Sequence, residues 1–183
     1  TSFFGAPFRI YSNMRPSRIN MHEEICYADV TEMAERIRAK ELSPVEVMRA
    51  HLERIEILNP RFNAIVTLVD GVLERAREAE AAIMRGEMIG PLHGVPFTVK
   101  DCIDAEGLRS TRGSRLFEDY FASTDATVVS RLKSAGGILI GKTNMPEFAL
   151  WWKTDNEVFG LTVNPWNPEH TTGGSSGGEG AAI

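Results

Sequence analysis

Apolar residues recur along this chain at two spacings, and together they predict helices that alternate with short strands. Apolar positions three or four residues apart predict helices at residues 29–37, 43–58, 73–85 and 125–135. Apolar runs, several of them rich in β-branched residues, predict strands at 62–69, 94–101 and 138–140. The clearest helix start is Ser43-Pro44-Val45-Glu46, a capping box with proline at the first helical position.

The order of these elements predicts an α/β fold. A short helix is expected around 146–152, then a structured loop rich in Pro, Asn, Thr, Gly and Ser, and a helix that begins near Glu179. Helices that alternate with apolar strands favour a mixed, largely parallel sheet covered by helices on both faces. Neither an internal repeat nor a low-complexity linker interrupts residues 21–183, which are expected to belong to one domain.

Residues 1–20 are expected to lie outside that domain. They begin with Thr1 rather than methionine, whereas Met21 leads directly into a helical segment. They also lack the charged start, long apolar middle and small-residue cleavage site of a secretory signal. We therefore expect Met21 to be the natural start, and the preceding residues to be upstream translation or an artificial addition.

Composition and charge narrow the class of partner. With 183 residues, of which 43% are hydrophobic and 25% charged, the chain has the composition of an ordinary soluble globular protein. A net charge of -5 argues against direct nucleic-acid binding and against anionic membrane surfaces. No apolar stretch approaches the roughly 18 residues of a transmembrane segment. A cytoplasmic protein that acts on a small molecule is therefore expected, and a homodimer stays open.

The two cysteines give no sign of a metal or redox site. Cys26 and Cys102 are far apart in the sequence, and neither belongs to a C-x-x-C pair or lies near a histidine at zinc-binding spacing. Two buried thiols in a reducing compartment are the expected state.

The segment richest in chemical information is Gly173-Gly174-Ser175-Ser176-Gly177-Gly178-Glu179-Gly180. Glycines on both sides of the serine pair allow backbone angles that other residues avoid, and they let a ligand or a neighbouring strand approach closely. The serine hydroxyls are therefore expected on backbone that side chains leave uncovered. A flexible Gly/Ser linker is the alternative, but linkers seldom lie between an Asn-Pro-Trp turn and an Ala-rich helix start.

This segment and two upstream segments together resemble the amidase signature family. All three occur in the family's order and at its spacing, and the similarity runs from about Val30 to Ile183. The two upstream segments are Pro91-Leu92-His93-Gly94-Val95-Pro96-Phe97-Thr98-Val99-Lys100-Asp101 and Gly141-Lys142-Thr143-Asn144-Met145-Pro146-Glu147-Phe148. The resemblance implies the amidase signature fold, incomplete in this chain.

The resemblance also implies an activity and assigns residues to it. Members of the family hydrolyse or transfer amide groups with a lysine, a serine that follows a cis peptide bond, and a second serine that acts as the nucleophile. Lys100 matches the family lysine and Ser175 matches the cis-serine, while Gly174, Ser176 and Gly177 would support them. The substrate would be a small-molecule amide, and neither a metal nor another cofactor is implied.

The physical chemistry of a lysine base fits these assignments. Only a neutral lysine can take a proton from a serine, and with an ordinary pKa near 10.4 only about one lysine in a thousand is neutral near pH 7.4. The site would have to lower the lysine pKa by roughly 3, and burial acts in this direction because it disfavours the ammonium form. Lys100 follows the uncharged run Val95–Val99, which favours burial, and Asp101 should point to the opposite face of the strand.

The family nucleophile has no match among these residues. In the family it lies in a further Gly-Gly-Ser segment beyond the serine pair, whereas this chain ends at Ile183. That segment would also donate the N–H groups of the oxyanion hole. The chain is therefore expected to be the N-terminal part of a longer enzyme, truncated before the nucleophile, and to be inactive alone.

Two activities within the family stay open. One is a free-standing amidase, including the fatty-acid amide hydrolase branch, and the other is the A subunit of a glutamyl- or aspartyl-tRNA amidotransferase. Glu179 stands where that subunit more often has a small residue, and Phe148–Trp152 is more apolar, which favours the hydrolase. Ala149, Leu150 and Trp151 are then candidate substrate-binding residues, because an apolar wall suits an acyl or aryl group. The alternative is that these tryptophans pack in the core.

Two interpretations outside the family compete. Gly136–Thr143 matches the P-loop pattern G-x-x-x-x-G-K-[ST], but its variable positions form a predicted strand and a helix precedes them, which disfavours nucleotide binding. The chain could also be an inactive fragment that acts as a binding module. His93 and His170 are isolated, so both are expected to be structural. Glu147 and Glu179 are expected to be helix-start charges.

Overall fold

A computed structural model of the protein describes residues 21–87 and 90–183. The α-helices are α1 (Met21–Tyr27), α2 (Val30–Arg38), α3 (Pro44–Phe62), α4 (Val72–Met84), α5 (Thr127–Ser134) and α6 (Gly177–Ala182). The strands are β1 (Ile65–Leu68), β2 (Pro96–Lys100) and β3 (Ile138–Thr143), and two short 3-10 helices are η1 (Arg115–Phe117) and η2 (Glu147–Ala149). Residues 1–20 lie outside the described part, so the expected start at Met21 stays a prediction.

The three strands form one small mixed sheet in the order β1-β3-β2. β2 runs parallel to β3, with Lys100 opposite Thr143, and β1 runs antiparallel to β3, with Ile65 opposite the same threonine. The central strand β3 is buried at all six positions. The connection from β2 to β3 passes through α5, which supplies the crossover that a parallel pair requires.

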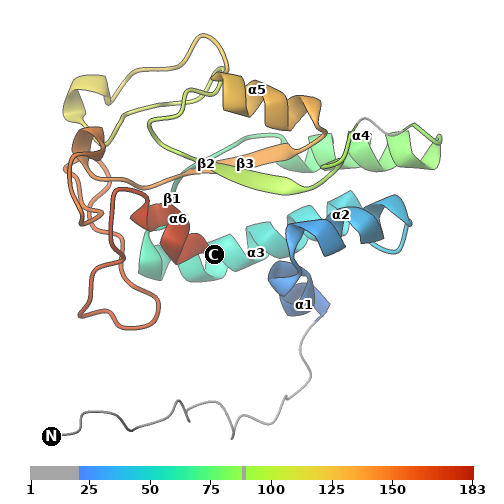
Figure 1. The fold of residues 1–183 in the computed structure, drawn as a ribbon, viewed down its shortest axis with the longest axis horizontal. Helices are drawn as coiled ribbons and strands as arrows, with labels where there is room; N and C mark the ends of the chain where they lie inside the picture. Colours follow the sequence, from blue (N-terminus) through green and yellow to red (C-terminus); the bar gives the residue numbers. More distant parts are fainter. Residues whose placement is uncertain (1–20, 88–89) are drawn as a thin grey trace, which may run out of the picture.

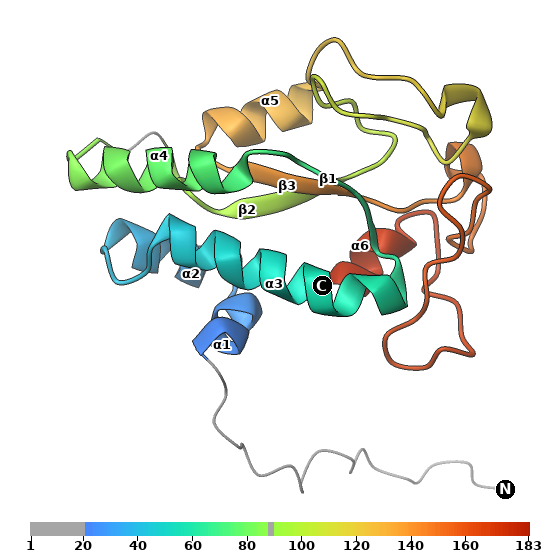
Figure 2. The ribbon, with the colours of Figure 1, turned by 180° about the vertical axis from the view of Figure 1, so that it is seen from behind.

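Helices cover both faces of this sheet (Figure 1). α5 lies on one face and α2 and α3 lie on the other, and Figure 2 shows the same arrangement from behind, with α4 beside the sheet. Apolar side chains from α3, α4, α5 and the strands meet in the main core, where Met48, Ala76, Val129 and Leu139 are almost completely buried. The predicted α/β fold with a mixed, helix-covered sheet is therefore confirmed.

α3 begins where the sequence predicts but runs further than predicted. The Ser43 side chain accepts hydrogen bonds from the N–H groups of Val45 and Glu46, and the Glu46 carboxylate accepts one from the Ser43 N–H, which completes the capping box. The predicted end before Pro60 is wrong, because α3 continues to Phe62. Pro60 lies in the last turn, where the loss of one helical hydrogen bond is tolerated because the helix ends soon afterwards.

Three other predicted boundaries shift. β1 starts at Ile65, because the Asn59 side chain binds both the N–H and the carbonyl of this residue at 2.8 Å and holds the chain there. β3 continues as far as Thr143, because its last residues pair with both neighbouring strands. α5 begins at Thr127, two residues later than predicted, and the side chain of its N-cap residue, Ala126, cannot accept a hydrogen bond from the first turn.

The structure tests the expected burial of the two cysteines and the expected absence of a transmembrane segment. Cys26 and Cys102 carry reduced thiols, but both residues are half-buried rather than buried. Cys26 lies at the margin of the apolar cluster that α1, α2 and α3 form, which explains its partial exposure. Within residues 21–87 and 90–183, every helix is too short or too polar to cross a bilayer.

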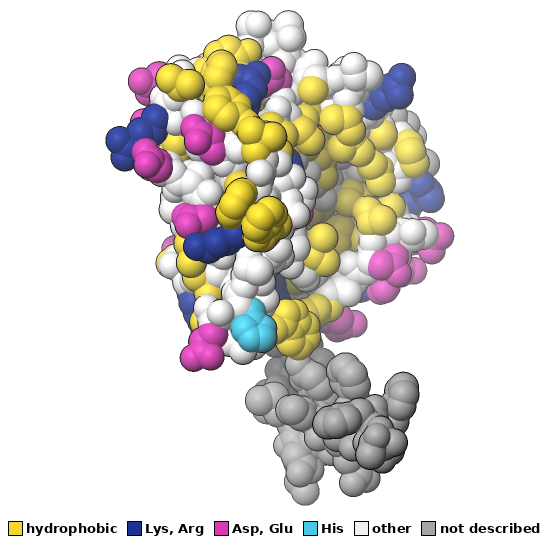
Figure 3. Space-filling model, turned by 60° about the vertical axis from the view of Figure 1, so that its left-hand side comes forward, with side chains coloured by type: hydrophobic (Ala, Val, Ile, Leu, Met, Phe, Trp, Pro, Cys, Tyr) yellow, Lys and Arg dark blue, Asp and Glu magenta, His cyan; other side chains and the backbone are white. Residues whose placement is uncertain are grey.

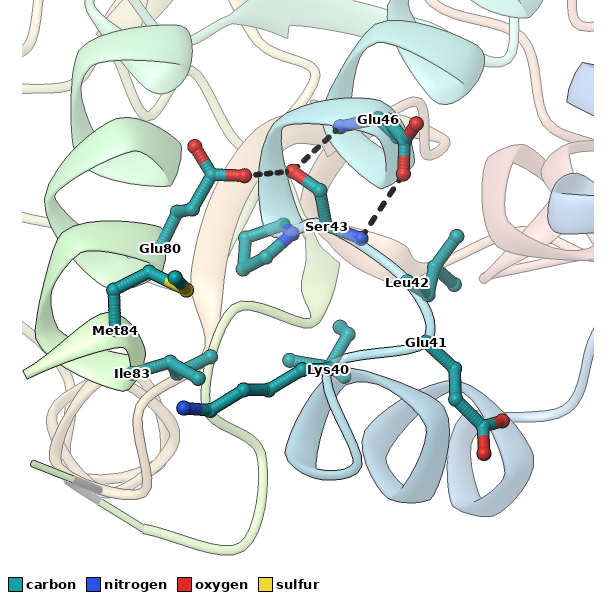
Figure 4. A pocket seen from close by; sticks show the side chains of 10 residues that line it. Lys40, Glu41, Leu42, Ser43, Glu46, Glu80, Ile83 and Met84 are labelled. Atoms are coloured by element: carbon teal, nitrogen blue, oxygen red, sulfur yellow. Dashed lines mark hydrogen bonds between the residues drawn. The ribbon is translucent and has the colours of Figure 1, made fainter. Parts of the chain in front are cut away.

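A pocket of about 150 Å³ lies where α2, α3 and α4 meet, and the cap of α3 lines it (Figure 4). Here the Ser43 hydroxyl donates a hydrogen bond to the Glu80 carboxylate of α4 while it accepts the two cap hydrogen bonds. The cap therefore also joins α3 to α4.

We predict that Ser43→Ala lowers the free energy of unfolding by about 1–2 kcal/mol, because α3 loses its cap. Glu80 also loses the hydroxyl that it binds. Denaturant unfolding followed by circular dichroism measures the change. Ser134→Ala, at the exposed last position of α5, is the matched control and should change stability by less than about 0.5 kcal/mol. Equal stabilities of the two variants would contradict the role of the cap.

Candidate active site

Lys100 and Ser175 lie side by side, although 75 residues separate them in the sequence. Lys100 is the last residue of β2, and Ser175 lies in the loop just before α6. Lys100 Nζ and Ser175 Oγ form a hydrogen bond of 2.6 Å, and both residues are half-buried. The peptide bond between Gly174 and Ser175 is cis. The structure therefore brings the two predicted catalytic residues within proton-transfer distance.

Lys100 is less enclosed than the sequence predicts. Val95 and Val99 are buried, whereas Lys100 is half-buried, because successive side chains of a strand point to opposite faces. β2 also forms one edge of the sheet in the described part of the chain, so no strand covers its outer side there. The uncharged run therefore buries its valines more fully than the lysine that follows it.

The loop that carries Ser175 rests directly on backbone and hydroxyl groups. A Cβ atom at Gly174 would lie only 2.6 Å from the Trp151 carbonyl oxygen, so this close approach requires glycine. The Gly177 N–H donates to Thr154 Oγ1 at 3.0 Å, and this hydroxyl donates to the Gly173 carbonyl at 2.9 Å. Gly174 and Gly177 thus fix the loop on both sides of Ser175.

Ser176 lies beside the pair without joining it. The residue is exposed, and among the described residues its hydroxyl forms neither a hydrogen bond to Lys100 or Ser175 nor a helix cap. Its carbonyl accepts a hydrogen bond from the Gly180 N–H at 3.1 Å, which starts α6. In this part of the structure the support expected from Ser176 therefore comes from its backbone and not from its hydroxyl.

An exposed apolar segment borders the same loop. Phe148 and Ala149 have positive φ angles of 50° and 61°, so the predicted short helix is reduced to η2. The turn leaves Leu150 and Trp151 exposed at 79% and 53%, and Trp151 stacks on Trp152 with ring centroids 4.1 Å apart. These tryptophans do not pack in the core. Figure 3 views the molecule from the side of these loops and shows hydrophobic side chains gathered on its surface.

On the opposite face of β2, Asp101 joins a buried network with Lys142. Lys142 Nζ donates to the Asp101 carbonyl at 3.0 Å and to the Ser110 hydroxyl, and it lies 3.7 Å from the Asp101 carboxylate. That carboxylate also accepts a hydrogen bond from Thr111 Oγ1 at 2.7 Å. Burial lowers the pKa of Lys142, although the Asp101 charge acts in the opposite direction. Asp101 thus points away from Lys100, as strand alternation predicts.

This network argues against a phosphate-binding loop at Gly136–Thr143. A P-loop needs exposed N–H groups between a strand and a helix, whereas Ile138–Thr143 is strand β3 itself. Lys142 is fully buried, and Thr143 donates its hydroxyl to Glu179 Oε1 at 3.1 Å. Both polar side chains of the motif therefore bind groups inside the protein.

Comparisons with known proteins identify the family. A family model described as Amidase matches residues 46–183. The chain belongs to the amidase signature family. It is 45% identical over 161 residues to the A subunit of the glutamyl-tRNA(Gln) amidotransferase of Carboxydothermus hydrogenoformans, and the match covers 87% of this chain and 33% of that protein. It is 46% identical over 153 residues to the indoleacetamide hydrolase of Bradyrhizobium diazoefficiens, and this match covers 83% of this chain and 29% of that protein.

A solved amidase signature structure shares the fold. The crystal structure of a bacterial aryl acylamidase matches with a TM-score of 0.83 and 34% identity, covering 87% of this chain and 34% of that chain. The present chain therefore spans about a third of the length of the relatives that it matches. The predicted family is confirmed. Because this chain is about equally similar to the hydrolase and to the amidotransferase, identity does not separate the two activities.

The other candidate residues from the sequence have structural or surface positions. His93 is buried and forms a 2.8 Å hydrogen bond from Nε2 to the Ala79 carbonyl of α4, which fits the predicted structural role. His170 is exposed in the loop before the serine segment. Glu147 is exposed in the first turn of η2, as expected of a helix-start charge.

Two polar residues have contacts in the structure that differ from those expected from the sequence. It places Lys142 in a phosphate motif and Glu179 at a helix start, whereas in the structure Lys142 anchors Asp101 and Glu179 bridges two strands. A lysine inside an apolar strand was the available signal for the first, because a buried lysine requires a partner. The sequence offers no comparable signal for Glu179, since its partners lie far away in the chain.

We predict that Lys142→Met lowers the free energy of unfolding by about 3–5 kcal/mol, because it leaves the buried Asp101 charge without a counter-charge. Denaturant unfolding at neutral pH measures the loss. Lys153→Met, which breaks only the exposed ion pair with Asp155, is the matched control and should cost less than about 1 kcal/mol. Similar losses in both variants would show that the buried network contributes no more than a surface pair.

Proposed function

We propose that this chain is part of an amidase that hydrolyses a carboxylic amide through a lysine, a cis-serine and a nucleophilic serine. Lys100 is the base, and Ser175 carries the proton between the base and the nucleophile. The observation that supports this most directly is the 2.6 Å hydrogen bond between Nζ and Oγ. The nucleophile and the oxyanion-binding N–H groups come from a part of the enzyme outside these 183 residues, so the 183 residues alone are inactive.

In the proposed first step, two protons move in sequence through Ser175. The nucleophilic hydroxyl passes its proton to Ser175 Oγ as its oxygen attacks the carbonyl carbon, and Ser175 passes its own proton to the neutral Lys100 amine. The ammonium group then returns a proton through Ser175 to the departing nitrogen, which leaves as ammonia or an amine. Water then attacks the ester left on the nucleophilic serine and passes a proton through Ser175 to Lys100. The ammonium group returns a proton to the serine oxygen as its bond to the acyl carbon breaks, which releases the acid. Ser175 is a neutral hydroxyl after each transfer, so its contribution depends on its position.

The proposed substrate class is an amide with an apolar acyl or aryl group. Leu150 and Trp151 expose apolar surface beside the Ser175 loop, and the backbone of Trp151 lies against Gly174. Ala149 shapes the turn through its positive φ. One relative is named an indoleacetamide hydrolase, and indoleacetamide is an amide with an aromatic ring. The exposed apolar wall favours this hydrolase over the amidotransferase. Base, relay and nucleophile are all side chains, so the mechanism calls on no cofactor.

In the complete enzyme, Lys100→Ala and Ser175→Ala should each lower kcat for amide hydrolysis by at least about a hundredfold, because each removes a step of proton transfer. Steady-state kinetics on a panel of amides measures the loss. Ser176→Ala is the matched control, because this neighbouring serine is exposed and lies outside the pair, and it should retain turnover close to the parent. Turnover near the parent value in either Lys100→Ala or Ser175→Ala would refute the assignment.

A separate test concerns the substrate. Trp151→Ala should raise KM about tenfold for aryl amides, because it removes apolar contact surface, and it should leave KM for a short amide such as acetamide unchanged. Trp166→Ala, which removes a tryptophan that is 84% exposed, is the control. Equal effects of Trp151→Ala on aryl and short amides would argue against a role in recognising the acyl or aryl group.

A further inference from the structure

We propose that Glu179 is a positioning residue that holds Ser175 within hydrogen-bond distance of Lys100. The inference rests on the proposed function, because it concerns the same pair. Glu179 lies in the first turn of α6, directly after the loop that carries Ser175. Its carboxylate accepts a hydrogen bond from Thr98 of β2 at 2.9 Å and another from Thr143 of β3 at 3.1 Å. We call the side chains of Glu179, Thr98 and Thr143 the Glu179 clamp.

The two threonines of the clamp lie next to Lys100 on the sheet. Thr98 precedes Lys100 by two positions on β2, so both side chains project from the same face of the strand. Thr143 is the residue of β3 that pairs with Lys100 in the parallel register. The clamp therefore attaches α6 to the sheet at the position of the lysine.

Residues 177–182 of α6 have few side chains that could attach them to the sheet. Residues 177–182 read Gly-Gly-Glu-Gly-Ala-Ala, so within this part of the chain Glu179 is the only side chain larger than a methyl group. Gly178 lies so close to the sheet that a Cβ atom there would approach the Ala64 carbonyl oxygen to 2.8 Å, and its N–H donates to the Asn144 carbonyl at 3.2 Å. Since residues 177–182 offer almost no apolar side chain to bury, the position of this first part of the helix depends on such backbone contacts and on the clamp.

A carboxylate suits this position for a specific reason. It has two oxygens that only accept hydrogen bonds, and the clamp presents one hydroxyl donor to each. A glutamine keeps the shape but has a single acceptor oxygen, so one threonine would have to turn its hydroxyl. A simple helix-start charge would interact with the N–H groups of α6 and would not depend on the threonines. Removing a threonine hydroxyl therefore distinguishes the clamp from a helix-start charge.

The test compares Glu179→Ala, Glu179→Gln and Thr98→Val with the parent in the complete enzyme. Glu169→Ala is the matched control, because Glu169 is an exposed glutamate in the loop before the serine segment. Steady-state kinetics on an amide gives kcat and KM. Hydrogen exchange followed by mass spectrometry reports the opening of residues 173–183, and it needs no catalytic activity.

We expect Glu179→Ala to lower kcat by about 10- to 100-fold with KM nearly unchanged, because a small misplacement of Ser175 impairs proton transfer and not binding. Exchange across residues 173–183 should accelerate at least about tenfold, because local opening becomes easier. Glu179→Gln and Thr98→Val should fall between Glu179→Ala and the parent in both measurements. Glu169→Ala should match the parent.

Three outcomes would overturn the inference. In the first, Glu179→Ala has the same kcat and the same exchange rates as Glu169→Ala. In the second, Glu179→Ala exchanges faster but keeps the kcat of the parent. In the third, Thr98→Val has the kcat and the exchange rates of the parent. If the parent enzyme hydrolyses no amide, the proposed function fails instead. The exchange rates of Glu179→Ala and Thr98→Val then decide alone whether the clamp holds α6, and unchanged rates would again overturn the inference.

Discussion

The contact between Lys100 and Ser175 depends on two distant stretches of backbone meeting at one end of a small sheet. The register of β2 on β3 places Lys100 opposite Thr143, and the loop before α6 then brings Ser175 to the amine at 2.6 Å. Neither stretch reaches this position through bulky side chains. The loop lies on the backbone of residues 151–153, where Gly174 permits the close approach. Close backbone packing therefore brings the two residues together, and hydrogen bonds of the Thr154 and Glu179 side chains add to it.

The alternation of side chains along the strand also keeps the Asp101 carboxylate away from the Lys100 amine. A carboxylate facing Lys100 would favour its charged form and oppose its proposed use as a base. Asp101 follows Lys100 directly, yet it points to the other face, where Lys142 and Thr111 bind it in a fully buried network. Lys100 at the end of β2 and the next residue, Asp101, thus belong to two environments, the first half-buried and the second fully buried.

The sequence predicts much of this arrangement because most of its signals are local. Ser43-Pro44-Val45-Glu46 marks the start of α3, and the apolar run 138–140 marks the central strand. The resemblance of three segments to one family links Lys100 with Ser175 across the 75 residues between them. In contrast, the end of α3 depends on where a proline falls within the last turn, which the dipeptide Asn59-Pro60 alone does not reveal.

What the sequence could not predict is set by contacts between distant residues. The positive φ of Phe148 arises where this turn meets other loops, and it removes the helix that local spacing favours. The roles of Lys142 and Glu179 depend on partners that lie 32 to 81 residues away. Residue type and local spacing carry no information about contacts between residues that are far apart in the chain. The sequence therefore predicts only the local roles of a phosphate motif for Lys142 and a helix start for Glu179.

The long separation within the pair has a consequence for synthesis of the protein. At typical rates of about 5–20 residues per second, the ribosome adds Ser175 several seconds after Lys100. During this interval the Ser175 loop and α6 do not yet cover the residues of β2. An exposed strand edge can pair with other chains. A lysine at the end of that strand is also the residue type that discourages such pairing. The residue that we propose as the base would thus also discourage this strand from pairing with other chains before the Ser175 loop is made.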